Sequence, residues 1–288
     1  MTADVSIVMA TRDRVDRVAG TLAHLLALPD QPPVIVVDNG SQDGTAERVR
    51  RDFPSVRVLA LATNRGAVAR TVGVEAAGTP YVAFADDDSW WAPGALGLAA
   101  ACFDPCDRLA VVAARILVGP EERLDPVCQA MASSPLPPVP GLPGPPILGF
   151  VACGAVVRRS AYLDVGGFDP LLFFLGEEDA LALDLASRGW HLAYVPEVVA
   201  HHHPAGGGRQ VMARRRLQAR NALLTAWTRR SPRTALQATA RAGRAATRDP
   251  AHRGALLDAT RRLPAVVRQR RPVPTEVERW RRMLDAAG

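Results

Sequence analysis

The sequence predicts an α/β protein in which helices flank a mostly parallel sheet, followed by a basic helical extension. Two observations support this prediction. Short apolar runs alternate with helical patterns over residues 5–91, an order typical of parallel strands joined by helices. The charge then changes sign: residues 1–204 carry 15 Arg and 24 acidic residues, whereas residues 205–288 carry 20 Arg and 5 acidic residues. We therefore expect an acidic body and a basic extension that contacts phosphate-rich material.

Composition sets the general class. With 288 residues, 48% of them hydrophobic, the chain can form one large α/β domain with or without a smaller unit. No apolar run reaches the length of a membrane span, and the N-terminus lacks the pattern of a signal peptide. We expect a cytoplasmic protein, either free or peripheral on the cytoplasmic face of a membrane. The four cysteines have no zinc-site spacing, and we expect reduced thiols.

The first half divides into strand and helix in turn. Each apolar run is four to six residues long, and each helical pattern follows a turn that contains polar residues. The expected strands are residues 5–10, 34–37, 56–60 and 81–85, and the expected helices contain residues 18–26, 46–51 and 66–77. Such alternation indicates right-handed crossovers between parallel strands.

Polar side chains follow three of these strands. Thr11 and Arg14 follow the first, Asp38 and Asn39 end the second, and residues 86–88 follow the fourth. Because the carboxyl ends of parallel strands meet at one edge, a ligand is expected there. A nucleotide fits this edge: Asp38 accepts a hydrogen bond from its base, and Arg14 meets a phosphate.

Asp86, Asp87 and Asp88 are three adjacent carboxylates. They repel one another unless a cation or polar ligand lies among them, and Mg²⁺ takes oxygen ligands that it shares with phosphates. Taken alone, the triplet is equally consistent with a solvated acidic loop. At the end of a buried strand, it predicts a site for a divalent cation that bridges a diphosphate.

Four blocks, VSIVMATRDR, VIVVDNGSQDGT, NRGAVARTVGVEAAGTPYVAFADDD and GGFD…GEEDALALDLASRGWHLAYVPEVVAHHH, resemble those of family 2 glycosyltransferases. These are inverting enzymes with the GT-A fold, and the similarity spans roughly residues 4–204. It implies a nucleoside diphosphate sugar and a divalent cation, Mg²⁺ or Mn²⁺, held by a DxD motif that matches Asp86 and Asp88. It places the base near Asp38 and the diphosphate near Arg70, and Asn39, Gly66 and Asp87 complete the expected donor site. Two positions depart from the family pattern: Ala10 replaces a frequent Pro, and Thr71 replaces a frequent Asn.

The expected GT-A domain, residues 1–204, divides into a nucleotide-sugar half at about 1–91 and an acceptor half at about 147–204. Between them we expect a helix over 95–103 and a strand over 109–118. Residues 135–146 contain seven prolines, which excludes them from the interior of a sheet or helix. They are either a surface loop or a flap that closes over substrate. Strand character resumes over 149–157, followed by a short helix over 158–165.

Three acids, Glu177, Glu178 and Asp179, stand at a predicted helix start. Acids in a first turn are favoured by the helix dipole alone. The resemblance gives them a further role, because an acidic pair here supplies the base that deprotonates the acceptor hydroxyl. Alignment on Gly189 and Trp190 favours Glu178 as the base, whereas alignment on the acidic pair itself favours Asp179.

Three histidines, His201 to His203, follow the last predicted strand. In a strand, His201 and His203 face one way and His202 the other. The resemblance brings one histidine of this group to the cation or diphosphate, and we expect His201 or His202. An exposed or packed polar cluster is the alternative.

The extension, residues 205–288, opens with a predicted flexible break at 206–208. Met212, Leu223 and Trp227 then lie on an amphipathic helical pattern, and prolines divide the rest into short helices. Peripheral membrane contact, packing within the protein or between subunits, and nucleic-acid binding are the candidates. Nucleic acid is disfavoured, because aromatic residues make up only 5% of the chain and do not alternate with the Arg clusters.

The resemblance, together with these patterns, implies an inverting glycosyltransferase that moves a sugar to a hydroxyl of a glycan or lipid-linked acceptor, in cell-envelope glycan, glycolipid or glycoconjugate synthesis. The alternative is a non-catalytic nucleotide-sugar-binding or scaffold protein docked through its basic extension. Catalysis is favoured, because a pure binder needs no second acidic cluster at 177–179. A nucleotidyltransferase is expected to have a Gly-rich loop after the first strand, and residues 10–14 contain no glycine.

Overall fold

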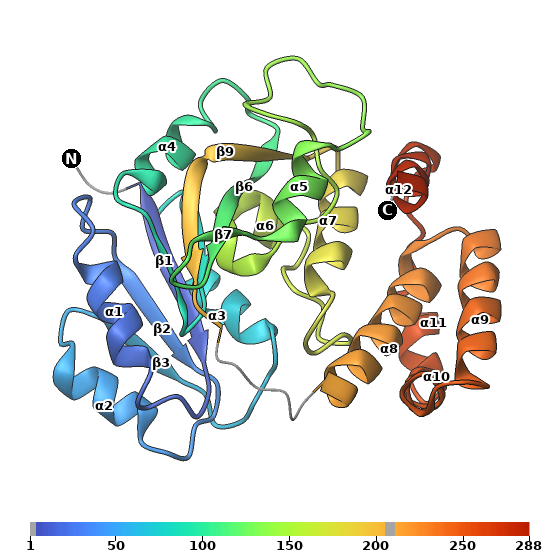
Figure 1. Ribbon diagram of the computed structural model, residues 1–288, viewed down its shortest axis with the longest axis horizontal. Coiled ribbons are helices and arrows are strands. Elements are labelled where there is room, and N and C mark those ends of the chain that lie inside the picture. The colour runs from blue at the N-terminus through green and yellow to red at the C-terminus, as the bar shows by residue number, and fades with distance from the viewer. Residues whose placement is uncertain (1–3, 205–210, 288) are drawn as a thin grey trace.

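The computed structural model describes residues 4–204 and 211–287. A body built on one twisted sheet is followed by helices that pack against its side (Figure 1). The strands run in the order β3-β2-β1-β4-β8-β6-β9-β5, with β7 paired to β6. The predicted α/β class with a helical extension is confirmed.

The first half of the sheet is parallel. It contains β1 (Val5–Thr11), β2 (Val34–Asp38), β3 (Arg57–Ala60) and β4 (Tyr81–Ala85). The helices between them are α1 (Val18–Leu26), α2 (Thr45–Asp52) and α3 (Val68–Ala76). These elements confirm the predicted strands and helices to within a few residues. In the β1–β2 register Thr11 lies opposite Asp38, so the polar strand ends meet as expected.

The second half of the sheet is mixed. β8 (Ala155–Arg158) is antiparallel to β4 and to β6 (Leu109–Val118), and β6 is parallel to β9 (His191–His202). The predicted strand over 149–157 was too long, because residues 152–154 form a 3₁₀ turn. A Cβ on Gly154 in this turn would lie 2.6 Å from Ile116 Cγ1, so only glycine fits there.

Six further elements complete the described part of the body. The predicted helices at 95–103, 158–165 and from 177 are confirmed as α4 (Ala95–Ala101), α6 (Arg159–Asp164) and α7 (Glu177–Ser187). Sequence analysis missed α5 (Pro126–Ala132) and the short strands β5 (Ser89–Trp91) and β7 (Arg123–Leu124). β5 matters for the site, because it pairs Ser89 with His202 and Trp90 with His201.

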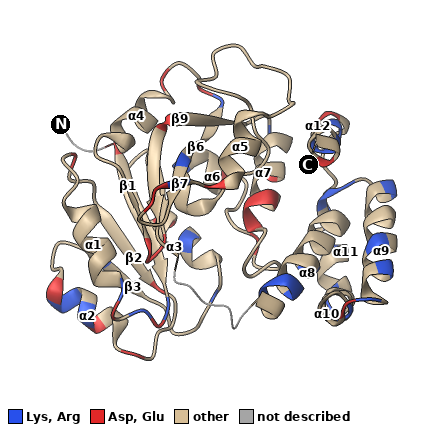
Figure 2. Ribbon diagram, in the orientation of Figure 1, with Lys and Arg blue, Asp and Glu red and all other residues tan. Residues whose placement is uncertain are grey.

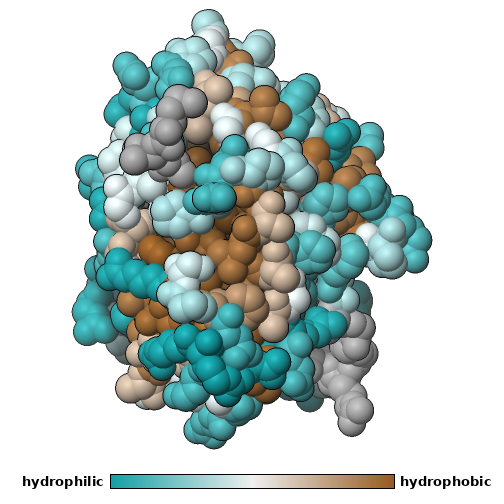
Figure 3. Space-filling view, turned by 90° about the vertical axis from the view of Figure 1, so that its left-hand side faces the viewer, coloured by the Kyte–Doolittle hydropathy of each residue, from teal (hydrophilic) through white to brown (hydrophobic). Residues whose placement is uncertain are grey.

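Alternating residues of β1 fill two separate cores, one on each side of the sheet. Val8 packs with Phe84 and Tyr162, whereas Ile7 and Met9 belong to a cluster under α1. Both sides of the strand are buried, as expected for a parallel strand covered by helices on each face. Seen from the left-hand side of Figure 1, hydrophobic residues are visible between hydrophilic ones on the surface of the body (Figure 3).

The proline-rich segment lies as a loop against β9. Tyr194 N donates to Pro145 O at 3.0 Å, and Ile147 N donates to Leu192 O at 3.0 Å. Gly144 permits this approach, because a Cβ there would lie 2.0 Å from Tyr194 O. The prolines therefore lie outside the regular strands, as predicted, and their loop is held by main-chain bonds to the sheet.

The described part of the extension is helical: α8 (Val211–Arg229), α9 (Pro232–Ala246), α10 (Pro250–Thr260), α11 (Leu263–Gln269) and α12 (Thr275–Ala287). Blue positions mark its arginines in Figure 2. None of the described helices combines the length and the hydropathy that a membrane span requires. The predicted break at 206–208 lies outside the described residues, and the domain boundary at residue 204 stays a prediction.

The extension packs on the body through apolar and charged contacts. Leu223 and Leu224 of α8 join Leu172 and Ala180 of the body in a third core. Arg229, with its side chain 1% exposed, donates to Asp169 Oδ2 at 2.8 Å and to both carboxylate oxygens of Asp184, at 3.0 and 2.8 Å. Two further arginines of the extension also pair with body acids: Arg271 with Asp184 and Arg281 with Asp179. Packing within the chain thus accounts for part of the predicted basic surface.

Candidate functional site

The carboxyl ends of β1, β2 and β4 form a polar rim. Thr11 Oγ1 donates to Asp87 Oδ2 at 2.8 Å, and Arg14 Nε lies 3.7 Å from Asp87 Oδ1. Thr21 Oγ1 of α1 donates to the Asp87 main-chain oxygen at 2.7 Å. Burial raises the pKa of Asp87 to about 6, against the Thr11 hydrogen bond, which lowers it. Asp87 therefore attaches the loop that follows β4 to both β1 and α1. Asp86 and Asp88 lie on either side of it in the sequence.

Asp38 and Asn39 lie beside this loop and differ in what they contact. Asp38 is buried and accepts a hydrogen bond from Ser41 N at 2.9 Å. Asn39 Nδ2 donates to Gly66 O at 3.0 Å, and its Oδ1 accepts from Arg65 N at 2.7 Å. The amide of Asn39 is thus used within the chain, where it shapes the wall of the rim by holding the loop before α3.

Arg70 of α3 links the rim to α7. Its Nη2 donates to Asp86 Oδ1, and its Nε has no partner among the described residues. Glu177 is also buried, and its Oε2 is likewise without a partner in the described part of the chain. Burial by itself would lower the pKa of Arg70, but Asp86, Glu177 and Glu178 hold it above its usual value. Unpartnered polar atoms in such a place indicate a polar ligand.

Asp88 lies at the other end of the triplet, close to β9. His202 Nε2 is 3.4 Å from Asp88 Oδ1, and Arg17 Nη1 is 3.7 Å from Asp88 Oδ2. The contact with Asp88 raises the pKa of His202. These groups meet because Ser89 of β5 pairs with His202, which brings the end of the triplet against β9.

His201 faces the opposite side of the strand. Its ring stacks on Trp90 with centroids 5.6 Å apart, and its Nδ1 lies 3.5 Å from Glu122 Oε1. Of the two histidines expected at the cation, the structure therefore places His202 beside Asp88 and His201 in an aromatic cluster away from it. The physical reason is the alternation of side chains along β9.

The donor set fits a cation that completes its coordination with substrate oxygens. Asp86 and Asp88 offer carboxylate oxygens, and His202 adds a ring nitrogen beside Asp88. Within residues 4–204 and 211–287, no group of three or more His, Cys, Asp or Glu is arranged to hold a metal ion by itself. A partial set suits Mg²⁺ or Mn²⁺, because such ions share their ligands with phosphates.

The acids of the first turn of α7 point in three directions. Glu177 is buried near Arg70, and Asp179 turns outward, where its Oδ1 lies 3.4 Å from Arg281 Nη1 of α12. Glu178 is partly buried, and its Oε1 accepts from Ala152 N at 3.4 Å. Burial, reinforced by Glu177, raises the pKa of Glu178 to about 8. A carboxylate near its pKa at neutral pH is suited to accept a proton.

The acids of the rim and Glu178 of α7 both act on one buried thiol, that of Cys153. Cys153 lies in the 3₁₀ turn before β8 and is 2% exposed. Burial raises its pKa well above the usual value, and Asp86, Arg70, Asp88 and Glu178 all act on the same thiol. The acids of the rim and the base candidate of α7 therefore both lie within electrostatic reach of this thiol, as does Arg70, whose Nη2 donates to Asp86 Oδ1.

The loop before α7 is held by a residue that sequence analysis missed. Phe173 and Leu175 both have left-handed backbone angles, φ 67° and 70°. The Nδ2 of Asn221, in α8, donates to the main-chain oxygens of Leu172, Phe174 and Leu175, at 2.9, 2.7 and 2.5 Å. On the other side of the loop, Ala67 N donates to Phe173 O at 2.6 Å. The only sequence signal was an amide on the apolar side of an amphipathic helix.

We expect Asn221→Ala to slow turnover more than it weakens donor binding. The change removes the side-chain donor of Phe174 O and Leu175 O in a strained loop, whereas Leu172 O keeps Arg220 Nη2 and Phe174 N as donors. Its expected cost is about 1–3 kcal/mol of folding free energy. A shift of about 1 Å in the acids of α7 lowers kcat by up to about 100-fold. Steady-state kinetics and nucleotide-induced shifts of the melting temperature separate the two effects. The control is Arg214→Ala, because Arg214 is an exposed residue of the same helix. An unchanged kcat in Asn221→Ala would contradict this positioning role.

Comparison with protein families gives one match that covers more than half of the chain. The model described as glycosyl transferase family 2 matches residues 6–166. This confirms the resemblance seen in the sequence. The matched range contains β1 to β4, the Asp triplet and Arg70, whereas α7 and the extension lie beyond it.

Two curated relatives are both from Mycobacterium tuberculosis. One is an N-acetylglucosaminyl-diphospho-decaprenol L-rhamnosyltransferase, 29% identical over 220 residues, which are 64% of this chain and 71% of the relative. The other is a pre-mycofactocin glycosyltransferase, 32% identical over 216 residues, which are 69% of this chain and 43% of the relative.

Solved structures at low identity share the fold. A mannosyltransferase from Pyrobaculum calidifontis in complex with GDP-Man and Mn²⁺ is 20% identical with a TM-score of 0.57, covering 100% of this chain and 81% of that one. GalNAc-T7 with UDP, GalNAc and Mn²⁺ is 15% identical with a TM-score of 0.60, and the match covers 80% of this chain and 49% of that one. Both support the predicted GT-A fold, and they carry no argument about this chain's ligands.

Proposed function

The chain belongs to glycosyl transferase family 2, and from this premise we propose that it catalyses inverting transfer of a sugar from a nucleoside diphosphate sugar to a hydroxyl acceptor. The observation that supports this most is that two acidic groups, Asp86 with Asp88 and Glu177 with Glu178, lie about Arg70, whose Nη2 donates to Asp86 Oδ1 and whose pKa Glu177 and Glu178 help to raise. A protein that only binds a nucleotide sugar needs the first group and has no use for the second.

Each side of the site has its own role in the proposed reaction. Asp38 accepts a hydrogen bond from the nucleotide base, and Arg14 and Arg70 bind the diphosphate. Asp86 and Asp88, with His202 beside them, would hold a divalent cation that shares its remaining coordination with the substrate. When bound, this cation neutralises the charge that develops on the departing diphosphate.

Glu178 acts on the acceptor. It takes the proton of the hydroxyl as that oxygen attacks the anomeric carbon, and the bond from this carbon to the diphosphate breaks in the same step. One in-line displacement inverts the anomeric configuration, and the proton ends on Glu178. Arg70, already charged and buried beside Asp86, stabilises the leaving group without rearrangement.

Stabilisation by nucleotides tests the donor site. The chain is heated with UDP, GDP, dTDP or CDP, with and without Mn²⁺, because a ligand that binds the native state raises its melting temperature. We expect a shift for one nucleotide that depends on the cation, followed by transfer from the matching sugar nucleotide. Stabilisation without any transfer to lipid-linked or glycan acceptors would favour the non-catalytic scaffold.

We also propose that the acceptor is lipid-linked and used in cell-envelope synthesis, with the enzyme peripheral on the cytoplasmic face of the membrane. One relative is named for a diphospho-decaprenol acceptor. On α10 and α11, Leu257, Leu263 and Val267 are exposed, and Arg261 and Arg268 are their neighbours in sequence. Exposed apolar side chains beside arginines suit an anionic bilayer.

Vesicle sedimentation tests the membrane contact. With vesicles that contain phosphatidylglycerol, we expect Val267→Glu to weaken binding by about tenfold, because it replaces an inserted apolar side chain by an acid that the lipid repels. Leu236→Glu on α9 is the matched control, since Leu236 is 71% and Val267 74% exposed. Equal binding by both variants and the unmodified chain would exclude this surface.

A further inference from the structure

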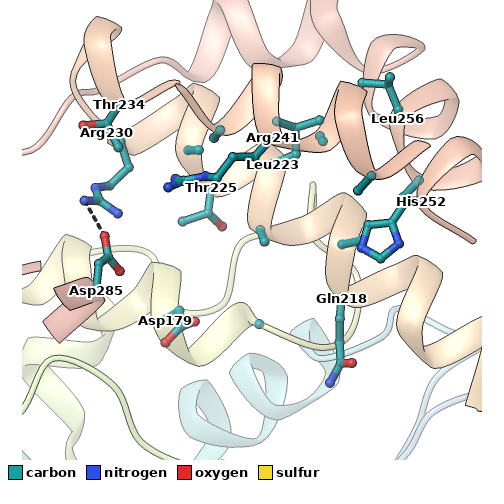
Figure 4. Close-up of a pocket in the computed structure, with 18 of the residues that line it drawn as sticks. Asp179, Gln218, Leu223, Thr225, Arg230, Thr234, Arg241, His252, Leu256 and Asp285 are labelled. Atoms are coloured by element: carbon teal, nitrogen blue, oxygen red, sulfur yellow. Dashed lines mark hydrogen bonds and ion pairs between the residues drawn. The ribbon is translucent and has the colours of Figure 1, made fainter. Parts of the chain in front are cut away.

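A cavity of about 700 Å³ lies between α7 and the helices of the extension. Gly176, Asp179 and Leu183 of α7 form one wall, and side chains of α8, α9, α10 and α12 form the others. Figure 4 shows this arrangement, with Asp179 below and the extension above. The cavity is separate from the rim at the carboxyl ends of β1, β2 and β4, because none of the rim residues lines it.

Small apolar side chains cover most of its walls. They repeat along α8 and α9 at helical spacing, and two more positions on α10 continue the surface: Ala219, Ala222, Leu223, Ala226, Ala238, Ala242, Ala245, Ala255 and Leu256. Alanine faces usually let helices pack closely, but here they border open space. A hydrocarbon chain gains free energy by covering such a surface, at about 0.8 kcal/mol per buried methylene.

Cationic side chains line one side of the cavity, and one of them is free. Arg230 Nη2 and Arg281 Nε lie 3.0 Å from the two carboxylate oxygens of Asp285. Arg241, which extends from α9 into the cavity (Figure 4), forms no hydrogen bond or ion pair with any residue that the structure describes. A free guanidinium beside an apolar wall is suited to bind a phosphate or diphosphate group.

The cavity reaches the helix turn that carries the base candidate, at the start of α7. Gly176 and Asp179 line it, and Glu178 lies between them in sequence, with its own side chain turned to Ala152 and the Arg70 side of the helix. A molecule held in the cavity therefore adjoins the helix turn that carries the proton acceptor. Because the donor nucleotide is proposed to bind at the rim, we consider the other substrate as the occupant of the cavity.

We propose that this cavity holds the phosphate-linked lipid part of the acceptor, with its hydrocarbon chain against the alanine faces and its phosphate or diphosphate on Arg241. The proposal rests on the transfer reaction proposed above and adds the place and the chemical class of the acceptor. Arg241 is then a binding residue for the acceptor and makes no contact with the donor.

Calorimetric titration of the full chain with farnesyl diphosphate tests this site. Omitting divalent cations removes binding that depends on the cation of the rim. We expect Arg241→Gln to weaken farnesyl diphosphate binding by about tenfold, because a charge-assisted contact to phosphate is lost. Arg244→Gln is the matched control, because Arg244 is exposed on the same helix and does not line the cavity. The affinity of Arg244→Gln for farnesyl diphosphate is expected to stay within about twofold of that of the unmodified chain.

Two further titrations separate the lipid from the phosphate. Ala242→Phe fills the cavity without changing its charge, and we expect it to weaken farnesyl diphosphate binding as well. Inorganic diphosphate is expected to bind the unmodified chain at least tenfold more weakly than farnesyl diphosphate, because it covers no apolar surface. Equal binding by Arg241→Gln and the unmodified chain, equal losses in Arg241→Gln and Arg244→Gln, or equal affinity for the two diphosphates would each overturn the proposal.

Nucleotide-induced stabilisation, measured on the same variants, keeps the two proposals apart. If nucleotide and Mn²⁺ still stabilise the chain while farnesyl diphosphate does not bind, the acceptor cavity is wrong and the proposed transfer stands. If farnesyl diphosphate binds through Arg241 while no nucleotide stabilises the chain, the cavity is a lipid-phosphate site and the proposed donor site is wrong.

Discussion

Asp88→Ala is expected to remove the cation-dependent stabilisation by nucleotide and to lower sugar transfer by about 10³-fold or more. The expected loss corresponds to several kcal/mol of stabilisation that a cation provides to the leaving diphosphate. Asp88 is the carboxylate that faces His202, at 3.4 Å, and its side chain makes no contribution to the apolar cores. The fold is therefore expected to persist, and the circular dichroism spectrum checks it.

The control for Asp88→Ala is Asp107→Ala, which removes an exposed carboxylate outside the rim. Full activity and unchanged nucleotide binding are expected for this variant. His202→Ala is expected to give an intermediate loss, because His202 supplies one ligand beside Asp88 and the diphosphate supplies others. Cation-dependent stabilisation that survives Asp88→Ala would assign the cation to another group.

The rim was predictable because its determinants are local. Three of the four apolar runs of the first half end at a polar residue of the rim, so the positions of Thr11, Asp38 and Asp86 follow from the strand ends and the rule for parallel sheets. The convergence of Asp88 with His202 is different, because it needs β5, a three-residue strand whose pattern is too short to identify.

The choice between His201 and His202 illustrates what the sequence leaves open. Adjacent residues of a strand face opposite sides, so one of the two had to turn away from the triplet. Which one depends on the pairing of β5 with β9, in which Ser89 lies opposite His202. That register is fixed by contacts across more than a hundred residues of sequence, and periodicity carries no information about it.

The contacts of the extension were unpredictable for the same reason. A charge imbalance indicates an anionic partner without naming it, and for Arg229 the partners are Asp169 and Asp184 of the same chain. Asn221 contacts main-chain oxygens, which have no sequence signature at all. The extension therefore both neutralises acids of the body and fixes the loop that leads into α7.

Glu178→Gln is expected to keep donor binding and to lower kcat by about two to four orders of magnitude, the usual contribution of general-base catalysis. The amide has nearly the same shape and cannot take the proton of the acceptor hydroxyl. Nucleotide-induced stabilisation measures donor binding, and initial rates at saturating substrates measure kcat. Loss of both together would indicate a structural role for Glu178.

The dependence of the rate on pH follows from the same residue. Burial and the neighbouring Glu177 raise the pKa of Glu178 to about 8, and a base acts only in its deprotonated form. The kcat of the unmodified chain is therefore expected to increase with pH through the neutral range and to level off above about pH 8. In Glu178→Gln this rise is expected to disappear, because the group that titrates is gone.

Asp179→Asn separates the two candidate bases. Asp179 turns to α12, its side chain is 51% exposed and pairs with Arg281 at 3.4 Å, and it borders the cavity proposed for the acceptor. An exposed ion pair of this kind contributes about 0–1 kcal/mol, so we expect kcat to change by less than about fivefold and to keep its rise with pH. An inactive Asp179→Asn together with an active Glu178→Gln would assign the base to Asp179.

That outcome would also change the direction from which the acceptor hydroxyl approaches α7. Glu178 faces Ala152 and the Arg70 side of the helix, whereas Asp179 faces the extension. With Asp179 as the base, the hydroxyl would approach from the cavity side of the helix.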